Sequence, residues 1–342
     1  MVTYSSSLEN GLRSSALSRI YETEILQASN VSNYGDYNEP DDIGLDISCN
    51  LSSVNVVNVM GNGKEGGFER IIKNAVDMLT FIVDDTDIQN APAINKANRE
   101  MRSIGLGAMG LHTYLATHGI HYESEEAKDF ANTFFMMMNY YSLQRSMELA
   151  KKREPFKHFK GSTYDTGEYF DMYLEKSFAP ESDKVDSLFK GIDVPSKKDW
   201  EKLKKKVQKH GVFHSYRQSI PPNGSSSYIL SVSSGAMPIM ERIEERTYGN
   251  SKTYYPMGGL DRENWDYFKE AYDMDMFRVI ELIATIQQHI DQGISFTLFV
   301  NDNVTTRDIN KLDMYAHYMG IKTIYYVRTR EVSIDECLAC TV

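Results

Sequence analysis

The chain has 342 residues, of which 41% are hydrophobic and 25% are charged, and its formal net charge is −11. This length and composition are typical of a soluble globular protein with one large domain or two ordinary ones. The acidic balance argues against a general nucleic-acid surface, which normally shows a basic stripe, although a helix start can still hold a phosphate locally. No apolar run approaches the roughly 18–20 residues that cross a bilayer.

Cysteine usage and the N-terminus indicate the compartment. Three cysteines are too few for a disulfide framework, and an odd number of thiols fits a reducing environment. Residues 1–7 lack the basic and then apolar pattern of a secretion signal. We therefore expect a cytoplasmic protein. Residues 1–19 are rich in serine and weakly patterned, which predicts a loose lead-in.

Hydrophobic periodicity predicts a mixture of strands and helices. A valine-rich alternating segment predicts a strand, or a strand followed by a helix, over Ile47–Val59. Apolar stripes at helical spacing predict helices over Phe68–Val83, Ala108–His118, Glu125–Lys152 and Met276–Ile290. Ser124 is the expected N-cap of the long helix. Residues 154–215 are lysine-rich and irregular, with a solvated helix over Lys197–Lys209.

The C-terminal third predicts a βαβ unit. A strand over Ser295–Val300, a helix that begins near Thr305 and ends at Tyr318, and a strand over Lys322–Val327 follow one another with short joints. Such an order implies parallel strands and a right-handed crossover. Tyr325 and Tyr326 are neighbours in this last strand and should point to its opposite faces. The predicted fold class is therefore α/β.

Two glycine-rich segments are interpreted as structural. Gly105–Gly110 has the spaced glycines of a dinucleotide-binding pattern, but residues 98–103 before it are polar and charged, where that fingerprint needs a buried strand. We interpret it as a closely packed helix start. Gly61–Gly67 lacks the spacing and the Ser or Thr of a phosphate-binding P-loop, so we interpret it as a turn.

The segment Pro221–Ser227 is a candidate phosphate-binding loop. Two prolines fix the approach of the chain, a glycine lets the backbone come close to a ligand, and three serines follow at a predicted helix start. N–H and O–H donors would then converge on a phosphate. An ordinary turn with a serine cap is the alternative.

The cysteines suggest thiol–disulfide exchange. Cys337 and Cys340 lie within the last six residues, and Cys49 lies in a segment whose pattern predicts packing. One fixed thiol and one pair on a chain terminus suit a reaction in which a thiolate must travel to a disulfide. Two alternatives remain open. In the first, the terminal pair is half of a zinc site, although no histidine follows it. In the second, Cys49 is simply a small core residue.

Several motifs, taken in order, resemble the C-terminal half of the catalytic large subunit of class I ribonucleotide reductase, closest to the class Ib branch. These motifs are Asp46–Ser53, Ile104–Gly107, Pro221–Ser225, Asp291–Gly293, Thr305–Lys311, Gly320–Lys322, Tyr325–Tyr326 and the terminal cysteine pair. Each is weak alone, but they follow the family's order from about residue 20 to the end.

The resemblance implies the family's ten-stranded α/β barrel, of which residues 20–330 would supply the later part, followed by a flexible redox-active tail at residues 331–342. Cys49 resembles the cysteine on a barrel strand that forms a disulfide when the 2′-hydroxyl of the substrate leaves as water. Cys337 and Cys340 resemble the tail pair that re-reduces this disulfide and passes oxidation to a thioredoxin- or glutaredoxin-type protein.

The resemblance also implies a radical path and a substrate site. Tyr325 and Tyr326 resemble the stacked pair that carries a radical inward from the small subunit. That subunit supplies the metal-tyrosyl radical, and this chain itself is expected to bind no metal or other cofactor. The residues implied to bind the ribonucleoside diphosphate substrate are Ser48, Pro222, Asn223, Gly224, Ser225 and Ser226.

The sequence departs from the family just before the Cys49 segment, where the family has an Asn-x-Cys-x-Glu strand. Ile20 and Glu22 stand in place of the asparagine and the radical-forming cysteine, and Glu24 alone matches, as a candidate catalytic residue. The first redox cysteine and the allosteric nucleotide sites would belong to a missing N-terminal half. The chain begins with methionine and keeps the family-like end, so we expect one piece of a split large subunit, inactive alone.

Two other classes of function remain open. Glu22 in place of the radical cysteine favours a non-catalytic fragment that binds or regulates an intact reductase, whereas the retained Cys49 argues against it. An independent thiol oxidoreductase would use the tail pair. A thioredoxin-type Cys-x-x-Cys begins a helix, which lowers its thiol pKa, but only two residues follow Cys340.

Overall fold

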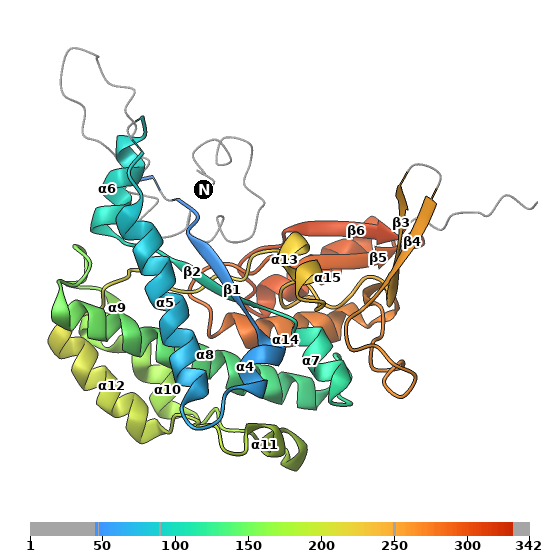
Figure 1. Ribbon diagram of the computed structural model, residues 1–342, viewed down its shortest axis with the longest axis horizontal. Helices are drawn as coiled ribbons and strands as arrows, with labels where there is room; N and C mark the ends of the chain where they lie inside the picture. The colour runs from blue at the N-terminus through green and yellow to red at the C-terminus, as the bar shows by residue number, and fades with distance from the viewer. Residues whose placement is uncertain (1–44, 47, 89, 249–250, 331–342) are drawn as a thin grey trace, which may run out of the picture.

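The computed structural model describes residues 45–46, 48–88, 90–248 and 251–330 (Figure 1). Within them the fold is α/β, as predicted. The strands are β1 Leu51–Asn55, β2 Gly105–Met109, β3 Ile243–Tyr248, β4 Ser251–Pro256, β5 Thr297–Asn301 and β6 Tyr326–Arg330. The helices are α4 Val56–Gly61, α5 Gly67–Asp85, α6 Pro92–Glu100, α7 Leu111–Thr117, α8 Glu125–Lys152, α9 Thr163–Thr166, α10 Asp171–Glu175, α11 Asp183–Phe189, α12 Lys197–His210, α13 Gly224–Ile229, α14 Met276–Gln287 and α15 Thr306–Tyr318, with 3₁₀ turns at Glu168–Phe170 and Ala271–Asp273. None of the helices in these ranges combines the length and hydropathy needed to cross a membrane.

Five extended segments of the described chain lie side by side in chain order: β1, β2, residues 216–220, residues 292–301 and β6. β1 pairs with β2, and β5 with β6, in parallel register. The links across the middle are Leu106 N to Arg217 O at 2.8 Å, Ser219 N to Leu106 O at 3.3 Å, Ile220 N to Gly293 O at 3.1 Å and Ser295 N to Ile220 O at 2.8 Å. Every one of these pairings is parallel, as the predicted βαβ unit requires.

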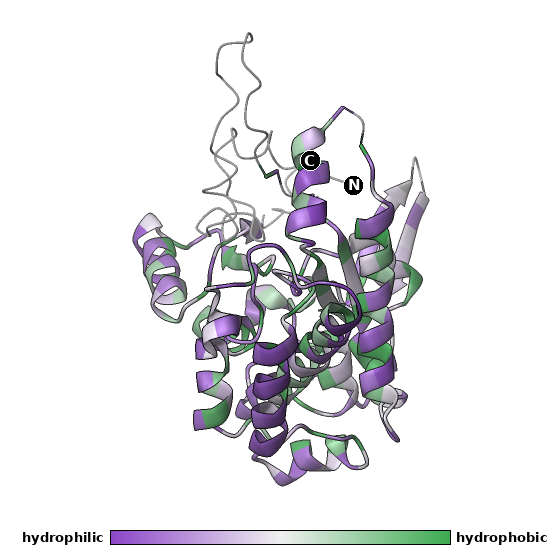
Figure 2. Cartoon of the chain, turned by 90° about the vertical axis from the view of Figure 1, so that its left-hand side faces the viewer, coloured by the Kyte–Doolittle hydropathy of each residue, from purple (hydrophilic) through white to green (hydrophobic). Residues whose placement is uncertain are grey.

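One face of this parallel array is covered by helices. α5 packs against α8, α8 against α14 and α14 against α15, so the helices follow the order of the strands. In Figure 1 α8 and α14 lie below the strands and α5 runs alongside β1. Figure 2, which turns the left-hand side to the viewer, shows hydrophobic and hydrophilic residues interleaved along the helices there. The core between the layers includes Val54, Leu106, Ala108 and Ile220, all buried. Burial of these apolar groups is the main favourable contribution to folding.

The long helix α8 forms as predicted. Ser124 caps it by accepting the N–H of Ala127 at 3.2 Å, with glutamates at Glu125 and Glu126 in the first turn and lysines in the last. These charges favour both ends of the helix dipole. α5 and α14 also lie where the apolar stripes predict them.

The glycine-rich segment before α7 is a strand, so its interpretation as a helix start was wrong. Gly105–Met109 is the fully buried strand β2, and α7 begins only at Leu111, after Gly110 with its left-handed φ of +83°. A Cβ on Gly107 would lie 2.5 Å from Ser219 O. The glycines therefore allow the neighbouring segment to approach closely.

Other boundaries differ in detail. Residues 154–215, expected to be irregular, form the short helices α9 to α12, and α12 buries Trp200 rather than being fully solvated. The turn predicted over Gly61–Gly67 is confirmed between α4 and α5. The last strand begins at Tyr326 rather than Lys322, and the Lys322 ammonium donates to the carbonyl of Asp291 at 2.7 Å.

Three buried histidines make the folded state sensitive to acid. Burial lowers the pKa of His112 to about 4 and the pKa values of His214 and His289 to about 3. His214 is held between the hydroxyls of Ser146 and Thr80, each 3.0 Å from a ring nitrogen. A neutral ring is thus favoured in the folded state.

We expect the free energy of unfolding to fall as pH drops from about 6.5 towards 4. The three histidines bind protons in this range in the unfolded chain, but not where they are buried in the folded chain. For His112 alone the loss at pH 4 is on the order of 3 kcal/mol. Urea unfolding between pH 7.5 and 4.5 measures it, and a constant unfolding free energy across this range would contradict the prediction.

Candidate functional site

The loop after the third extended segment is hydrogen-bonded to β1. Asn223 Nδ2 donates to Ser53 Oγ at 3.1 Å, and Asn223 N donates to Ser234 Oγ at 3.0 Å. Gly107 lies between this loop and β1, where an added Cβ would be 3.1 Å from Ser53 Oγ and 2.8 Å from Pro221 Cδ. The absence of a side chain at Gly107 therefore lets the loop lie beside β1.

The same loop leads into α13, and a helix start was predicted here. Asn223 is the N-cap, and the first bond of the helix runs from Ser227 N to Asn223 O at 2.8 Å. Four of the predicted substrate-binding residues are exposed here, namely Pro222, Gly224, Ser225 and Ser226. The first N–H groups of a helix have no acceptor within it, and its positive end favours anions. The loop can therefore present several donors to one phosphate.

Cys49 lies two residues before β1 and is half-buried. Its neighbours are anchored: Ser48 Oγ donates to Asn98 Oδ1 at 3.0 Å, and Asn50 Nδ2 donates to Ser48 Oγ at 3.1 Å. Because side chains alternate along an extended chain, residues 49, 51 and 53 fall on one face. Cys49 therefore lies on the face that carries Ser53 and, through it, the phosphate-accessible loop.

Tyr325 and Tyr326 contact each other, so the prediction that they point to opposite faces was wrong. Their ring centroids lie 4.1 Å apart with an angle of 56° between planes. Tyr325 precedes the first residue of β6, which frees it from strand alternation. Its hydrogen bond with Tyr326, together with burial, raises the pKa of Tyr325 to about 12. Tyr326 is 49% exposed, whereas Tyr325 is half-buried.

Other predicted site residues lie outside the described ranges. These are Glu24, Cys337 and Cys340, together with the lead-in at residues 1–19 and the tail at residues 331–342. In the ranges that are described, no group of three or more His, Cys, Asp or Glu side chains is arranged to hold a metal ion.

A buried ion pair supports the site from behind, and hydrophobic periodicity did not reveal it. The Asp291 carboxylate accepts the backbone N–H groups of Arg217 and Gln218, both at 2.8 Å. The Arg217 guanidinium is fully buried and donates to Tyr169 Oη at 2.7 Å. Lys322 Nζ donates to Asp291 O at 2.7 Å. The motifs around Asp291 and Lys322 thus fix the segment that leads into the loop.

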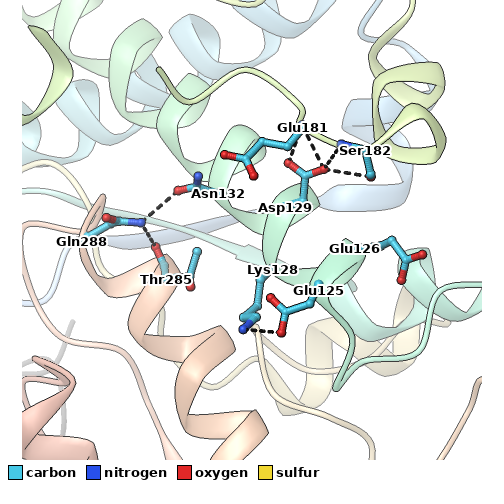
Figure 3. A pocket seen from close by; sticks show the side chains of 9 residues that line it. All are labelled: Glu125, Glu126, Lys128, Asp129, Asn132, Glu181, Ser182, Thr285 and Gln288. Atoms are coloured by element: carbon cyan, nitrogen blue, oxygen red, sulfur yellow. Dashed lines mark hydrogen bonds and ion pairs between the residues drawn. The ribbon is translucent and has the colours of Figure 1, made fainter. Parts of the chain in front are cut away.

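A polar hollow of about 570 Å³ lies elsewhere, on the helix layer between α8 and α14 (Figure 3). Its side chains bind one another. Asp129 accepts the N–H groups of Glu181 at 3.0 Å and Ser182 at 2.9 Å, and Lys128 Nζ lies 2.7 Å from a Glu125 carboxylate oxygen. Because these groups are already satisfied, we assign no ligand to the hollow.

Comparison with known proteins makes the α/β assignment specific. Residues 22–327 match the family model described as "Ribonucleotide reductase, barrel domain". The chain therefore belongs to the ribonucleotide reductase family, within which it corresponds to the C-terminal part of the large subunit. This confirms the resemblance seen in the sequence motifs.

The relatives are large-subunit proteins. Over 321 residues the chain is 60% identical to ribonucleoside-diphosphate reductase subunit alpha of Bacillus subtilis (strain 168), a match that covers 94% of this chain and 45% of that protein. The nrdEB subunit alpha of Bacillus phage SPbeta is 59% identical, with 94% of this chain and 29% of that protein covered. Ribonucleoside-diphosphate reductase subunit alpha of Mycoplasma pneumoniae is 35% identical, with 94% of this chain and 46% of that protein covered. The chain thus spans less than half the length of these relatives.

Gly107→Ala tests the close approach of the loop. The new Cβ would meet a backbone oxygen and a proline ring, neither of which can move cheaply. We expect a loss of about 2 kcal/mol or more in the free energy of unfolding, measured with urea. The matched control is Gly61→Ala, where nothing lies within 4 Å of the added Cβ. Equal stabilities of the two variants would show that Gly107 is not under this constraint.

Proposed function

We propose that the chain is the C-terminal half of the catalytic subunit of a split ribonucleoside-diphosphate reductase. It works with a chain that carries the N-terminal half, a small subunit that supplies the metal-tyrosyl radical, and a thioredoxin- or glutaredoxin-type reductant. The observation that carries the proposal, beside family membership, is the hydrogen bond between Asn223 and Ser53. It joins the exposed donor loop to the strand that follows Cys49.

The proposed architecture is a ten-stranded α/β barrel shared between two polypeptides. The five parallel segments of this chain make up one half, and the N-terminal half chain supplies the other five. The coverage of 45% of the Bacillus subtilis relative supports this division. We expect the assembly in the cytoplasm, where reducing conditions keep the tail thiols available.

The proposed reaction replaces the 2′-hydroxyl of a ribonucleoside diphosphate with hydrogen. The exposed N–H and hydroxyl groups at Gly224, Ser225 and Ser226 hold the diphosphate. Two thiols are oxidised to one disulfide, the C–O bond becomes a C–H bond, and the hydroxyl leaves with a proton as water. Cys49 provides one thiol and the N-terminal half the other. Exchange with Cys337 and Cys340 then restores the dithiol.

Tyr325 and Tyr326 are proposed to pass the radical from the small subunit. Their ring contact gives a short path for the electron. A tyrosine phenol is protonated at neutral pH, and the raised pKa of Tyr325 favours this form further, so its oxidation must move a proton as well. The hydrogen bond between the two hydroxyls offers a place for that proton.

Reconstitution tests the catalytic proposal. We expect ribonucleoside diphosphate reduction only when this chain, the N-terminal half chain encoded in the same genome and the radical subunit are all present. Cys49→Ser and Tyr325→Phe should each abolish turnover. Tyr254→Phe, on the exposed face of β4, is the matched control and should retain activity.

A mixture that stays inert, or that reacts equally well without this chain, overturns the catalytic proposal. The better account would then be a non-catalytic fragment that binds or regulates an intact reductase. The binding of this chain to an intact reductase would then be measured directly.

Ser53→Ala tests the bond that orients the loop. Loss of one hydrogen bond to Asn223 should raise the KM for the ribonucleoside diphosphate about 2- to 10-fold, with a smaller effect on kcat. Ser52→Ala, one residue earlier and on the alternate face of β1, is the control. Similar KM values for the two variants would remove the role assigned to Ser53.

A further inference from the structure

α5 lies at one end of the helix layer. In the described ranges it packs on β1 and β2, against α8, and against its chain neighbours α4 and α6. The flank facing α8 is built from ion pairs, namely Lys73 with Glu148 at 2.6 Å, Asp77 with Arg145 at 2.7 Å and Asp84 with Arg153 at 2.6 Å. The charged groups of α5 are thus concentrated on the side that already has a neighbour.

The outer surface of the C-terminal half of α5 carries an apolar patch. Met78 is 67% exposed, Phe81 69% and Ile82 43%. At 3.6 residues per turn, Met78 and Ile82 lie one turn apart on the flank turned away from α8, with Phe81 beside them towards solvent. Exposed Asn74 and Asp85 bound the patch at its two ends. An apolar centre with a polar rim is the anatomy of a protein interface.

The strand beneath this flank also has an open side. Among the described segments β1 has one ladder neighbour, β2, and α5 covers both strands. The unpaired edge of β1 and the apolar flank of α5 therefore lie at the same end of the two layers. An unpaired strand edge is a template for another strand, so both features call for a neighbour with a strand and an apolar helix.

We propose that Met78, Phe81 and Ile82 form the docking surface for an apolar helix of the polypeptide that carries the N-terminal half of the subunit. The inference rests on the proposed function for the identity of this partner. The chain corresponds to the C-terminal part of the large subunit and matches 45% of its Bacillus subtilis relative, so the partner in the proposed function carries the N-terminal part. Its helix lies against α5, and its strand lies beside β1.

Methionine oxidation tests the surface without a substitution. Met78 is 67% exposed and Met314, on α15 at the other end of the helix layer, is 72% exposed, so the two are matched reporters. In the isolated full chain, dilute hydrogen peroxide should oxidise both at similar rates. Binding of the N-terminal half chain should slow oxidation of Met78 at least about tenfold.

A triple variant gives the second readout. Met78→Ser, Phe81→Ser and Ile82→Ser together should weaken binding of the N-terminal half chain at least about tenfold, with an unchanged far-ultraviolet circular dichroism spectrum. Tyr254→Ser, on the exposed strand β4 of the separate hairpin, should bind like the wild type.

Each other outcome overturns the proposal in a distinguishable way. If the N-terminal half chain binds while Met78 stays reactive and the triple variant binds normally, the docking surface is wrong and the split reductase stands. If Met78 is already protected in the isolated chain, the chain's own residues cover the flank. If the two chains do not bind at all, the docking surface and the split reductase fail together.

Discussion

The close approach of three segments, β1, β2 and residues 216–220, at Gly105 and Gly107 is the constraint on which the site depends. A Cβ at Gly105 would lie 2.4 Å from Leu51 Cδ2, and one at Gly107 would lie 2.5 Å from Ser219 O. Without side chains at these points, β1 and the segment at 216–220 can sit close on either side of β2. That closeness brings Asn223 within hydrogen-bond distance of Ser53 and sets the loop beside the Cys49 strand.

The second support is electrostatic and lies behind the strands. Asp291 accepts two successive backbone N–H groups, while Arg217 is held by tyrosine hydroxyls in full burial. Buried charges of this kind are costly unless they are paired and hydrogen-bonded, and removing one partner leaves the other uncompensated. The two constraints act on the same segment: the glycines set its distance from β2, and the Arg217–Asp291 contact sets its position along the strand.

Sequence reasoning succeeded where one face of an element is buried. α5 and α14 each bury one apolar stripe, and α15 was predicted from its start at Thr305, which caps the helix. β2 was missed because a strand buried on both faces shows no alternation, and its spaced glycines suggested a closely packed helix start. The donor loop and Cys49 were found by motif, but their adjacency was not, because it depends on long-range pairing. Arg217 was missed because no local pattern marks a buried ion pair.

The order of the parallel segments has a topological consequence. Because they follow the chain from β1 to β6, the crossover helix between each neighbouring pair belongs to this same chain. No segment from elsewhere is interleaved among those the structure describes. A break in the polypeptide ahead of β1 therefore severs no strand–helix–strand unit. The parallel segments that the structure describes therefore form a topologically self-contained unit, whose connections all run within this one chain.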